Sequence, residues 1–251
     1  MSDEQEPDPV KRTRELSRPT LPKRFYKDVT IAGREEGNVV LLDGRSMRTP
    51  KKNTIAVANP TLARALADEW DAQKEFIDAN NMPLTRMINA GIDVVGAHRG
   101  PIIDELARYT GSDLLCYRAD RPDSLVKRQG ESWDPILRWA EDTLKMRFLL
   151  VEGLMPVDQP PETAVRAKEI YQEADNIALS GLHATTTLLG SAVLAIAHWK
   201  GRLSTAEAWK ASHVDEDWNF ETWGEDDDAK ARRAHRWYEM QAAALVVGRP
   251  D

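Results

Sequence analysis

The sequence concentrates its capacity for chemistry in one stretch, residues 213–228. Its carboxylates are interleaved with the aromatic side chains of Trp218, Phe220 and Trp223, and no lysine or arginine lies among them. The acidic residues are eight in number: Asp215, Glu216, Asp217, Glu221, Glu225, Asp226, Asp227 and Asp228. Three functions are open to such a stretch, namely helix capping, protein docking and the binding of a divalent metal ion.

Helix capping is the plainest interpretation, because residues 225–228 would lie at the N-terminus of a helix, where the macrodipole favours negative charge. Docking is the second, since indoles beside unpaired carboxylates supply the apolar anchors and the charge complementarity that interfaces use. The third is an acid-dependent or metal-dependent hydrolase. It would use Glu216, Glu225, Asp227 and His213, but consecutive acids on a helix point in different directions and do not converge on one ion.

Other signs of catalysis are missing from the sequence. It contains no GxGxxG after a strand, no GxxxxGK[ST] loop, no GxSxG elbow and no HExxH. The five histidines are scattered singly, and Cys116 lies in the apolar run 114–117, where a buried structural thiol is expected rather than a nucleophile. We therefore expect no enzyme, with no catalytic residue, no cofactor and no metal.

Composition excludes two further classes of protein. The formal net charge of -7 argues against a nucleic-acid binder, whose phosphate contacts need a basic face, and instead suits a basic protein partner. The longest apolar stretch, residues 182–199, is interrupted by polar residues and is shorter than the about 20 apolar residues that a bilayer requires, so we expect a buried core helix and no membrane insertion. A single cysteine allows no internal disulfide.

The first residues are rich in acids and hold three prolines without an apolar stretch. This composition fits neither a signal peptide nor a mitochondrial transit segment. We expect residues 1–22 to form a disordered tail and the protein to be a bacterial, cytoplasmic one.

Residues 24–57 have the pattern of strands. Residues 25–31 alternate between apolar and polar side chains, and further short apolar runs follow. The turn sequences around Gly37 and Gly44 are typical of connections between antiparallel strands, because glycine accepts a positive φ without steric cost. The pattern predicts a small β unit made of hairpins.

A helix should follow at Asn59 and Pro60, since asparagine caps the free amides of a first helical turn and proline fits the first helical position. Its apolar stripe can cover one face of the sheet; the stripe consists of Leu62, Leu66 and Trp70. The chain then breaks before Pro83, because the residue that precedes a proline is biased out of the helical region.

Almost every later segment has the period of a helix. The predicted helices cover residues 84–97, 101–110, 133–147, 161–179, 181–200, 205–218 and 226–246. The third of these would begin at Trp133, with Pro135 in its first turn. The predicted fold class is therefore α+β: a small N-terminal α/β domain of β-hairpins and a helix over residues 23–83, followed by a larger all-helical domain over residues 84–251.

Several ordered motifs resemble a known family, the F1 ATP synthase assembly chaperones that attend the α subunit. The motifs are RFYK at residues 24–27, LDGR at 42–45 with TP at 49–50, EWDAQ at 69–73, MPLT at 82–85, DLLCYR at 113–118, Gln129, WDP at 133–135 and WGE at 223–225. Together they extend over residues 23–240. The acids at 226–228 and the arginines at 232–233 resemble the bacterial form of the family.

This resemblance implies an N-terminal α/β domain joined to a larger helical one, in agreement with the boundary near Pro83. It also implies a role: to bind the unassembled F1 α subunit, to shield from aggregation the surface that the β subunit later covers, and to release α during F1 assembly. Eukaryotic relatives would do this in the mitochondrial matrix. We expect the chaperone itself to be a monomer. The partner-binding residues that the resemblance indicates are Glu216, Trp223, Gly224, Glu225 and Asp227. The less specific alternative is a general holdase, which protects many proteins and has no single client.

Overall fold

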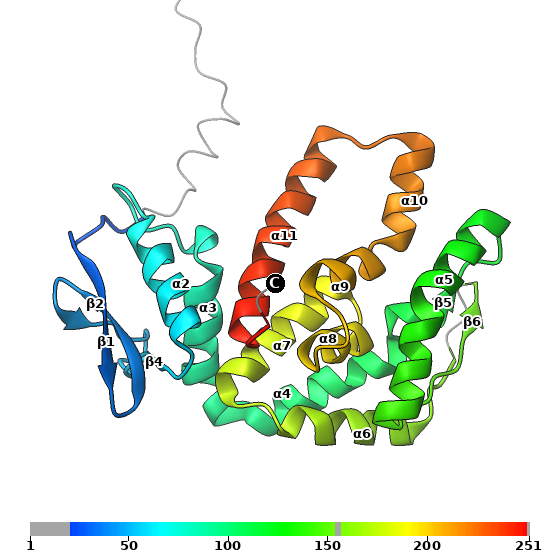
Figure 1. The fold of residues 1–251 in the computed structure, drawn as a ribbon, viewed down its shortest axis with the longest axis horizontal. Helices are drawn as coiled ribbons and strands as arrows, with labels where there is room; N and C mark the ends of the chain where they lie inside the picture. The colour runs from blue at the N-terminus through cyan, green and yellow to red at the C-terminus, as the bar shows by residue number, and fades with distance from the viewer. Residues whose placement is uncertain (1–20, 154–156, 250–251) are drawn as a thin grey trace, which may run out of the picture.

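The computed structural model describes residues 21–153 and 157–249, so the tail expected over residues 1–22 lies almost wholly outside the described residues. In Figure 1 the sheet occupies one end of the molecule, α2 and α3 stand beside it, and helices make up the rest. A small β unit followed by a mostly helical body confirms the predicted α+β class.

The sheet is built on one hairpin. Strand β1 (Val29–Arg34) pairs antiparallel with β2 (Gly37–Leu42), and β2 in turn pairs with β3 (Arg45–Ser46) and β4 (Ala56–Val57). Gly37 has a φ of +129°, and a Cβ built on it would lie 2.9 Å from the carbonyl oxygen of Val57, so only glycine fits this corner. The strand predicted from residue 25 begins only at Val29, because the preceding residues form the polar network described below.

Helix α2 (Pro60–Asp71) begins as predicted. The side chain of Asn59 accepts the N–H of Thr61 at 2.9 Å, and Pro60 fills the first helical position. The buried face of α2 packs on the sheet; it consists of Leu62, Ala63, Leu66 and Ala67. One apolar core thus joins the sheet to this helix.

A second helix and the last helix complete the core of the sheet. After the short turn η1 (Ala79–Asn81), helix α3 (Pro83–Ala90) contributes Leu84 and Ile88, and α11 (Asp227–Val246) contributes Ala242 and Val246. The β unit is therefore seated on helices from both parts of the chain.

The rest of the body is helical. From α3 the chain continues through the π-helical turn η2 (Gly91–Val95) into α4 (Gly96–Arg108), η3 (Tyr109–Ser112), η4 (Leu114–Cys116) and β5 (Tyr117–Arg118). Then follow α5 (Asp123–Trp139), the π-helical turn η5 (Ala140–Leu144), β6 (Val151–Glu152), which pairs in parallel with β5, α6 (Pro161–Gln172), α7 (Asn176–Leu189), α8 (Ala192–Trp199), α9 (Thr205–Ser212), α10 (Val214–Trp223) and α11.

Packing overrides sequence signals in α5, which was predicted to begin at Trp133. The helix starts ten residues earlier, at Asp123, and Pro135 lies in its interior. A proline there removes one helical hydrogen bond. The wholly buried Trp133, whose indole N–H donates to the carbonyl of Ala211 at 2.7 Å, fixes the helix against the body in spite of this loss.

Three other predicted helices are each divided in two. The helix predicted over residues 161–179 is interrupted before Asp175, whose side chain caps α7. Residues 181–200 break at Gly190, which has a φ of +63°. Residues 205–218 break at His213. Polar caps and a left-handed glycine end helices that the apolar period alone would continue.

Gly181, the first residue of the helix predicted over residues 181–200, lies in the interior of α7. A Cβ on this glycine would lie 2.8 Å from Cγ1 of Val246, so its small size serves the close packing of α11 on α7. The stretch 182–199 is largely buried in α7 and α8, as predicted. Across residues 21–153 and 157–249, no helix combines the length and apolarity needed to cross a membrane.

Candidate functional site

The acidic stretch forms a helical hairpin that projects from the body, with α10 and α11 as its arms (Figure 1). Gly224 ends α10: it has φ +86° and ψ 163°, a conformation that side chains rarely adopt, and its N–H donates to the carbonyl of Phe220 at 2.9 Å. We call residues 223–228 the hairpin tip.

Helix capping proves to be the role of the last acids. The side chain of Asp226 accepts the N–H of Ala229 at 2.7 Å and so caps α11, and Asp227 and Asp228 lie in the first turn of that helix. Their negative charge faces the positive end of the helix macrodipole. The capping interpretation is therefore correct for these three residues.

Other acids of α10 fasten the hairpin to α5 or join its two arms. The carboxylate of Glu221 accepts two hydrogen bonds from Arg128 of α5, at 2.6 and 2.9 Å, and this contact lowers the pKa of Glu221. Asp217 pairs with Arg233 of α11 at 2.5 Å. Asp215 accepts a hydrogen bond from the side chain of Gln129 in α5. These carboxylates are committed within the molecule and are not free for a partner.

Glu216 differs from them because, among the described residues, its ion-pair partner is a buried histidine whose burial opposes protonation. Its carboxylate is half exposed and lies 3.6 Å from Nε2 of His213. The ring of His213 is buried, which lowers its pKa, and its Nδ1 lies within hydrogen-bond distance of the carbonyl of Trp209, at 2.8 Å. The negative charge of Glu216 therefore remains available on the outer surface of α10.

The three aromatic residues of α10 have different surroundings. The indole of Trp218 lies 3.4 Å from the hydroxyl of Ser124, and the ring of Phe220 lies under the guanidinium of Arg233. Trp223 at the hairpin tip is 80% exposed, the highest value among the large apolar side chains of the described residues. Tryptophan is enriched among the residues that contribute most to protein interfaces, so this exposed indole is a candidate anchor for a partner.

Glu225 lies at the edge of a hollow of about 400 Å³ between the hairpin tip and α9. The indoles of Trp209 and Trp237, whose ring centroids are 5.3 Å apart, and the cations Lys230 and Arg233 also line the hollow. No group of three or more histidine, cysteine or acidic side chains fit to hold a metal ion occurs within residues 21–153 and 157–249. The predicted set of Glu216, Glu225, Asp227 and His213 is thus not brought together as a metal site.

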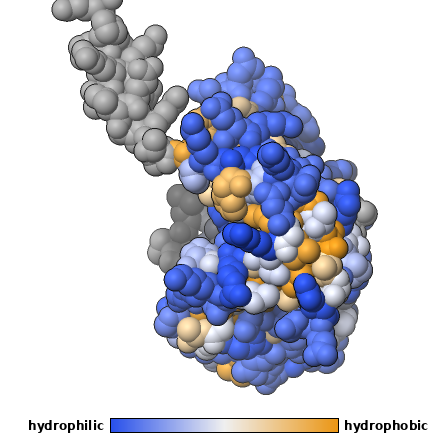
Figure 2. Space-filling view, turned by 90° about the vertical axis from the view of Figure 1, so that its left-hand side faces the viewer, coloured by the Kyte–Doolittle hydropathy of each residue, from blue (hydrophilic) through white to orange (hydrophobic). Residues whose placement is uncertain are grey.

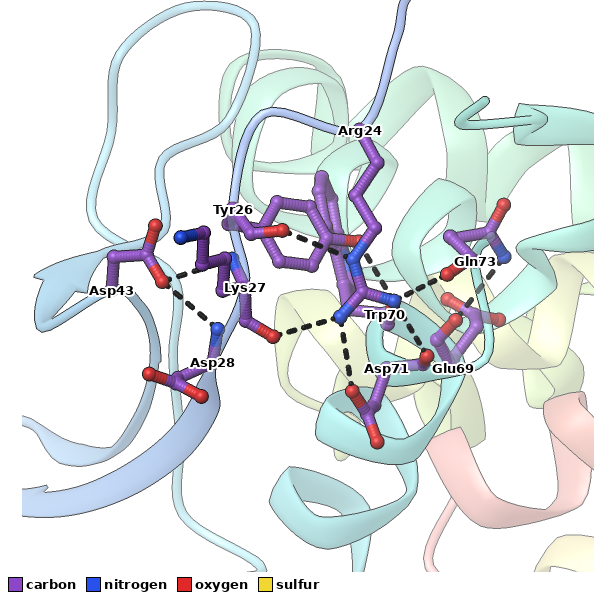
Figure 3. A network of polar contacts seen from close by, with 9 residues as sticks. All are labelled: Arg24, Tyr26, Lys27, Asp28, Asp43, Glu69, Trp70, Asp71 and Gln73. Carbon is purple, nitrogen blue, oxygen red and sulfur yellow. Dashed lines mark hydrogen bonds and ion pairs between the residues drawn. The ribbon is translucent and has the colours of Figure 1, made fainter. Parts of the chain in front are cut away.

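The motifs of the N-terminal unit serve structure instead. Figure 3 shows the guanidinium of Arg24 among backbone carbonyls, where it donates to Asp71 at 2.9 Å, to Lys27 at 3.0 Å and to Gln73. The hydroxyl of Tyr26 donates to the carbonyl of Trp70 at 2.7 Å. These bonds fasten the segment before β1 to the end of α2.

Glu69 has a capping role that sequence reasoning missed. Its carboxylate is buried and accepts the N–H groups of Leu84 and Thr85, each at 2.8 Å, at the start of α3. The hydroxyl of Thr85 donates to Glu69 at 2.6 Å and accepts the indole N–H of Trp70 at 2.8 Å. Only the fifteen-residue separation between the two motifs hid this contact, because capping patterns are sought within one turn.

Comparison with known proteins decides the family. A family model for the ATP12 chaperone protein matches residues 23–141. The solved structure of Atp12 from Paracoccus denitrificans is 37% identical to this chain, has a TM-score of 0.82, and the match covers 90% of this chain and 97% of that one. This chain belongs to the ATP12 chaperone family.

Two other relatives agree with this placement in the ATP12 family. A solved structure of a candidate chaperone from Agrobacterium tumefaciens is 46% identical, with a TM-score of 0.85 and coverage of 97% of this chain and 91% of that one. The mitochondrial protein atp12 of Schizosaccharomyces pombe is 23% identical over 220 residues, which are 82% of this chain and 75% of that protein.

Membership of the ATP12 family confirms the resemblance that the motifs indicated. The relatives are chaperones, so the prediction that this protein is not an enzyme is confirmed and the hydrolase hypothesis is wrong. The chain is a chaperone of F1 ATP synthase assembly.

Proposed function

We propose that this ATP12 chaperone binds the unassembled α subunit of F1 ATP synthase, shields the surface that the β subunit later covers, and releases α to β during assembly. The observation that carries the proposal is Trp223, an indole 80% exposed at the tip of a hairpin that one ion pair fastens to α5 and another holds together between its arms. A rigid exposed aromatic side chain loses little conformational entropy on binding and fills a pocket on a partner well.

The proposed contact set consists of Glu216, Trp223, Gly224, Glu225 and Asp227. Trp223 supplies the apolar anchor, and Gly224 fixes the turn that presents it. The three carboxylates lie on the same hairpin as the anchor and add negative charge, which suits a basic patch on the client.

The energetics allow binding and release without a nucleotide. An orphan subunit exposes an apolar interface, and a chaperone that covers about 1,000–2,000 Å² of it removes much of the drive to aggregate. A dissociation constant between about micromolar and nanomolar, or about -8 to -12 kcal/mol, protects the client yet yields to the larger permanent interface with β. We further propose that the protein acts as a monomer in the bacterial cytoplasm.

Co-purification tests the proposed client. The chaperone is mixed with isolated α and, separately, with isolated β, and we expect a complex with α alone. Binding to β alone, or to neither subunit, would end the proposal. Protection of unrelated aggregating proteins equal to the protection of α would show a general holdase instead.

Charge reversal tests the proposed site. The double variant Glu216→Lys and Glu225→Lys should bind α at least about tenfold more weakly, because like charges then face the client. Circular dichroism should show an unchanged fold. The matched control is Glu162→Lys, an exposed acid on α6, which should bind as the wild type does. Equal affinity in all three proteins would move the site away from the hairpin.

A further inference from the structure

His213 lies at the junction between α9 and α10, where the helical hairpin leaves the body. It ends α9 and precedes the first turn of α10, with φ -116° and ψ 19°, outside the helical region. Its side chain is 2% exposed, and the ring stacks on Trp209 of α9 with the ring centroids 4.0 Å apart. The position of the ring is therefore fixed by its neighbours.

The neighbours of Nδ1 determine where the neutral ring of His213 carries its proton. Nδ1 lies 2.8 Å from the carbonyl oxygen of Trp209 and 2.8 Å from the hydroxyl oxygen of Ser212. Ser212 donates its own hydroxyl proton to the carbonyl of Trp209, also at 2.8 Å, so Nδ1 faces two acceptors. A ring nitrogen between two acceptors has to be the protonated one, and we therefore assign the proton to Nδ1 and the lone pair to Nε2.

The other ring nitrogen, Nε2, lies near a carboxylate. Oε2 of Glu216, three residues along the chain, is 3.6 Å from Nε2, and the side chain of Glu216 is 51% exposed. Both atoms are acceptors while the ring is neutral, so no hydrogen bond joins them. A proton added to Nε2 places an imidazolium beside a carboxylate, and the two then attract each other as an ion pair with a charge-assisted hydrogen bond. The protonation state of Nε2 therefore decides whether Glu216 is paired.

Burial and the charges on α10 and α11 set the pH at which His213 gains this second proton. Burial of the ring has the largest effect and lowers the pKa of His213 from its ordinary value of 6.5. Arg233 and Arg236 of α11 act in the same direction, although Arg233 is paired with Asp217, whereas the negative charge of Glu216 raises the pKa. The neighbours on α9 described above carry no charge. The ring is therefore neutral at neutral pH and becomes charged in acidic solution.

We propose that His213 and Glu216 form a proton-operated switch, which withdraws the carboxylate of Glu216 from the outer surface of α10 in acidic solution. This proposal rests on the proposed function, because it takes Glu216 to be part of the surface that meets the client. In the open state, at neutral pH, Glu216 presents a negative charge to a basic patch. In the closed state the imidazolium neutralises that charge, so the client is bound less tightly.

Nuclear magnetic resonance of the histidine rings tests the switch in the chaperone alone. In protein labelled with ¹⁵N at histidine, His213 should carry its proton on Nδ1 at about pH 7.5 and gain the second proton with a pKa below 6.5. In Glu216→Gln this pKa should fall further, by about half a unit or more, because the favourable negative charge is lost. A proton on Nε2 at about pH 7.5, or a pKa that Glu216→Gln leaves unchanged, overturns the proposal.

The sheet unit provides an internal control for this titration. It lies on the far side of α11 from α10 (Figure 1), and Figure 2 shows its end of the molecule as a mostly hydrophilic surface with scattered apolar patches. The backbone amide signals of β1 and β2 should therefore not follow the titration of His213. Signals of the sheet that shift with the same midpoint would show a change of the whole fold and overturn a local switch.

The pH dependence of binding tests the consequence for the client. His213→Asn keeps a side-chain N–H for the carbonyl of Trp209 but cannot take up a second proton. As the pH falls from about 7.5 to about 5.5, the affinity of the wild type for isolated α should fall about fivefold more than that of His213→Asn. The matched control is His235→Asn, because Nε2 of His235 also lies near a glutamate, 3.8 Å from Oε1 of Glu239. This control should follow the wild type.

The outcomes separate the switch from the proposed function. If α binds at no pH, the proposed function is overturned, and the ring titration alone decides whether the switch exists. If the affinity for α has the same pH dependence in the wild type and in His213→Asn, the switch does not act on the client and the proposal is wrong. If His213→Asn does not fold, Glu216→Gln replaces it in the comparison, because it leaves no carboxylate for the imidazolium to withdraw.

Discussion

Among the tryptophans of this chain, Trp223 and Trp133 lie at opposite extremes of exposure. Trp133 is wholly buried and donates its indole N–H to a backbone carbonyl, whereas Trp223 is 80% exposed. At the scale of single residues, exposure therefore distinguishes a tryptophan that stabilises the fold from one that we propose meets a partner.

Replacement of Trp223 by alanine should leave stability unchanged and weaken binding of α by about thirtyfold or more, which is the effect of losing an interface hot spot. Titration calorimetry measures the affinity, and thermal unfolding checks the fold. Val165→Ala removes another exposed apolar side chain, on α6, and should leave the affinity as it is. An affinity that survives Trp223→Ala would show that the hairpin tip is not an anchor.

Asp113 should make the stability of the protein depend on pH, because its carboxyl is wholly buried at the start of α8. It accepts hydrogen bonds from the hydroxyl of Ser191 at 2.7 Å and from the N–H of Val193 at 3.0 Å, yet burial outweighs these bonds and raises its pKa to about 6. The folded state therefore binds this proton more tightly than the unfolded state, whose pKa is about 4.

The sign of the pH dependence follows from this raised pKa. Between about pH 4 and pH 6 the wild type should lose stability as the pH rises, by up to about 3 kcal/mol, relative to Asp113→Asn, in which the site does not titrate. Urea unfolding of both proteins across this range measures the difference. A difference that is constant with pH, or that grows in favour of the wild type, contradicts the raised pKa.

At the scale of elements, the hairpin of α10 and α11 is positioned by its ends. Arg128 and Gln129 of α5 hold α10, and Arg233 ties α11 to it. Gly224 provides the corner between the two helices, at a φ and ψ that essentially only glycine adopts. The position of the hairpin tip therefore depends on the backbone conformation of Gly224.

Gly224→Ala should cost about 1–3 kcal/mol of unfolding free energy, because the new Cβ strains the corner or forces it to another conformation. The same change at Gly33, which has ordinary strand geometry and open space, should be nearly neutral. Urea unfolding of both variants gives the comparison. Equal stability of the two would show that the corner relaxes freely.

An element could be predicted from the sequence where the residues that define its ends lie close together along the chain, and not where they lie far apart. Local signals placed the start of α2 at Asn59 and the start of α11 near Asp226, since a cap and its helix are neighbours along the chain. The start of α5 was missed because Trp133 is held by Ala211, and the role of Glu69 because it caps a helix beyond the next turn. Interactions across the fold leave no pattern within one window of sequence.

The candidate site was predicted only in part for the same reason. The density of acids pointed to residues 213–228, and the motif pointed to Trp223. The sequence could not show which carboxylates are already used: Glu221 by Arg128, more than ninety positions away, and Asp217 by Arg233. Their partners stand on α5 and α11, and only the fold brings them together.

At the scale of the whole molecule, the proposed function requires that the chaperone release its client by competition, without a chemical energy source. We expect isolated β to displace the chaperone from a preformed complex with α, because the permanent interface buries the larger area. Size-exclusion chromatography without nucleotide measures free chaperone as β is added. A complex that persists at excess β until ATP is supplied would contradict release by competition.

Helix α11 contributes side chains to two hydrophobic cores, and this arrangement affects how the chain folds during its synthesis. Ala242 and Val246 complete the packing under the sheet, while Met240 and Val247 lie in the core of the helical body. The sheet strands leave the ribosome some two hundred residues before the segment that covers them. We therefore expect the nascent N-terminal unit to stay incompletely folded until synthesis is nearly finished, when one helix closes both halves in a single step.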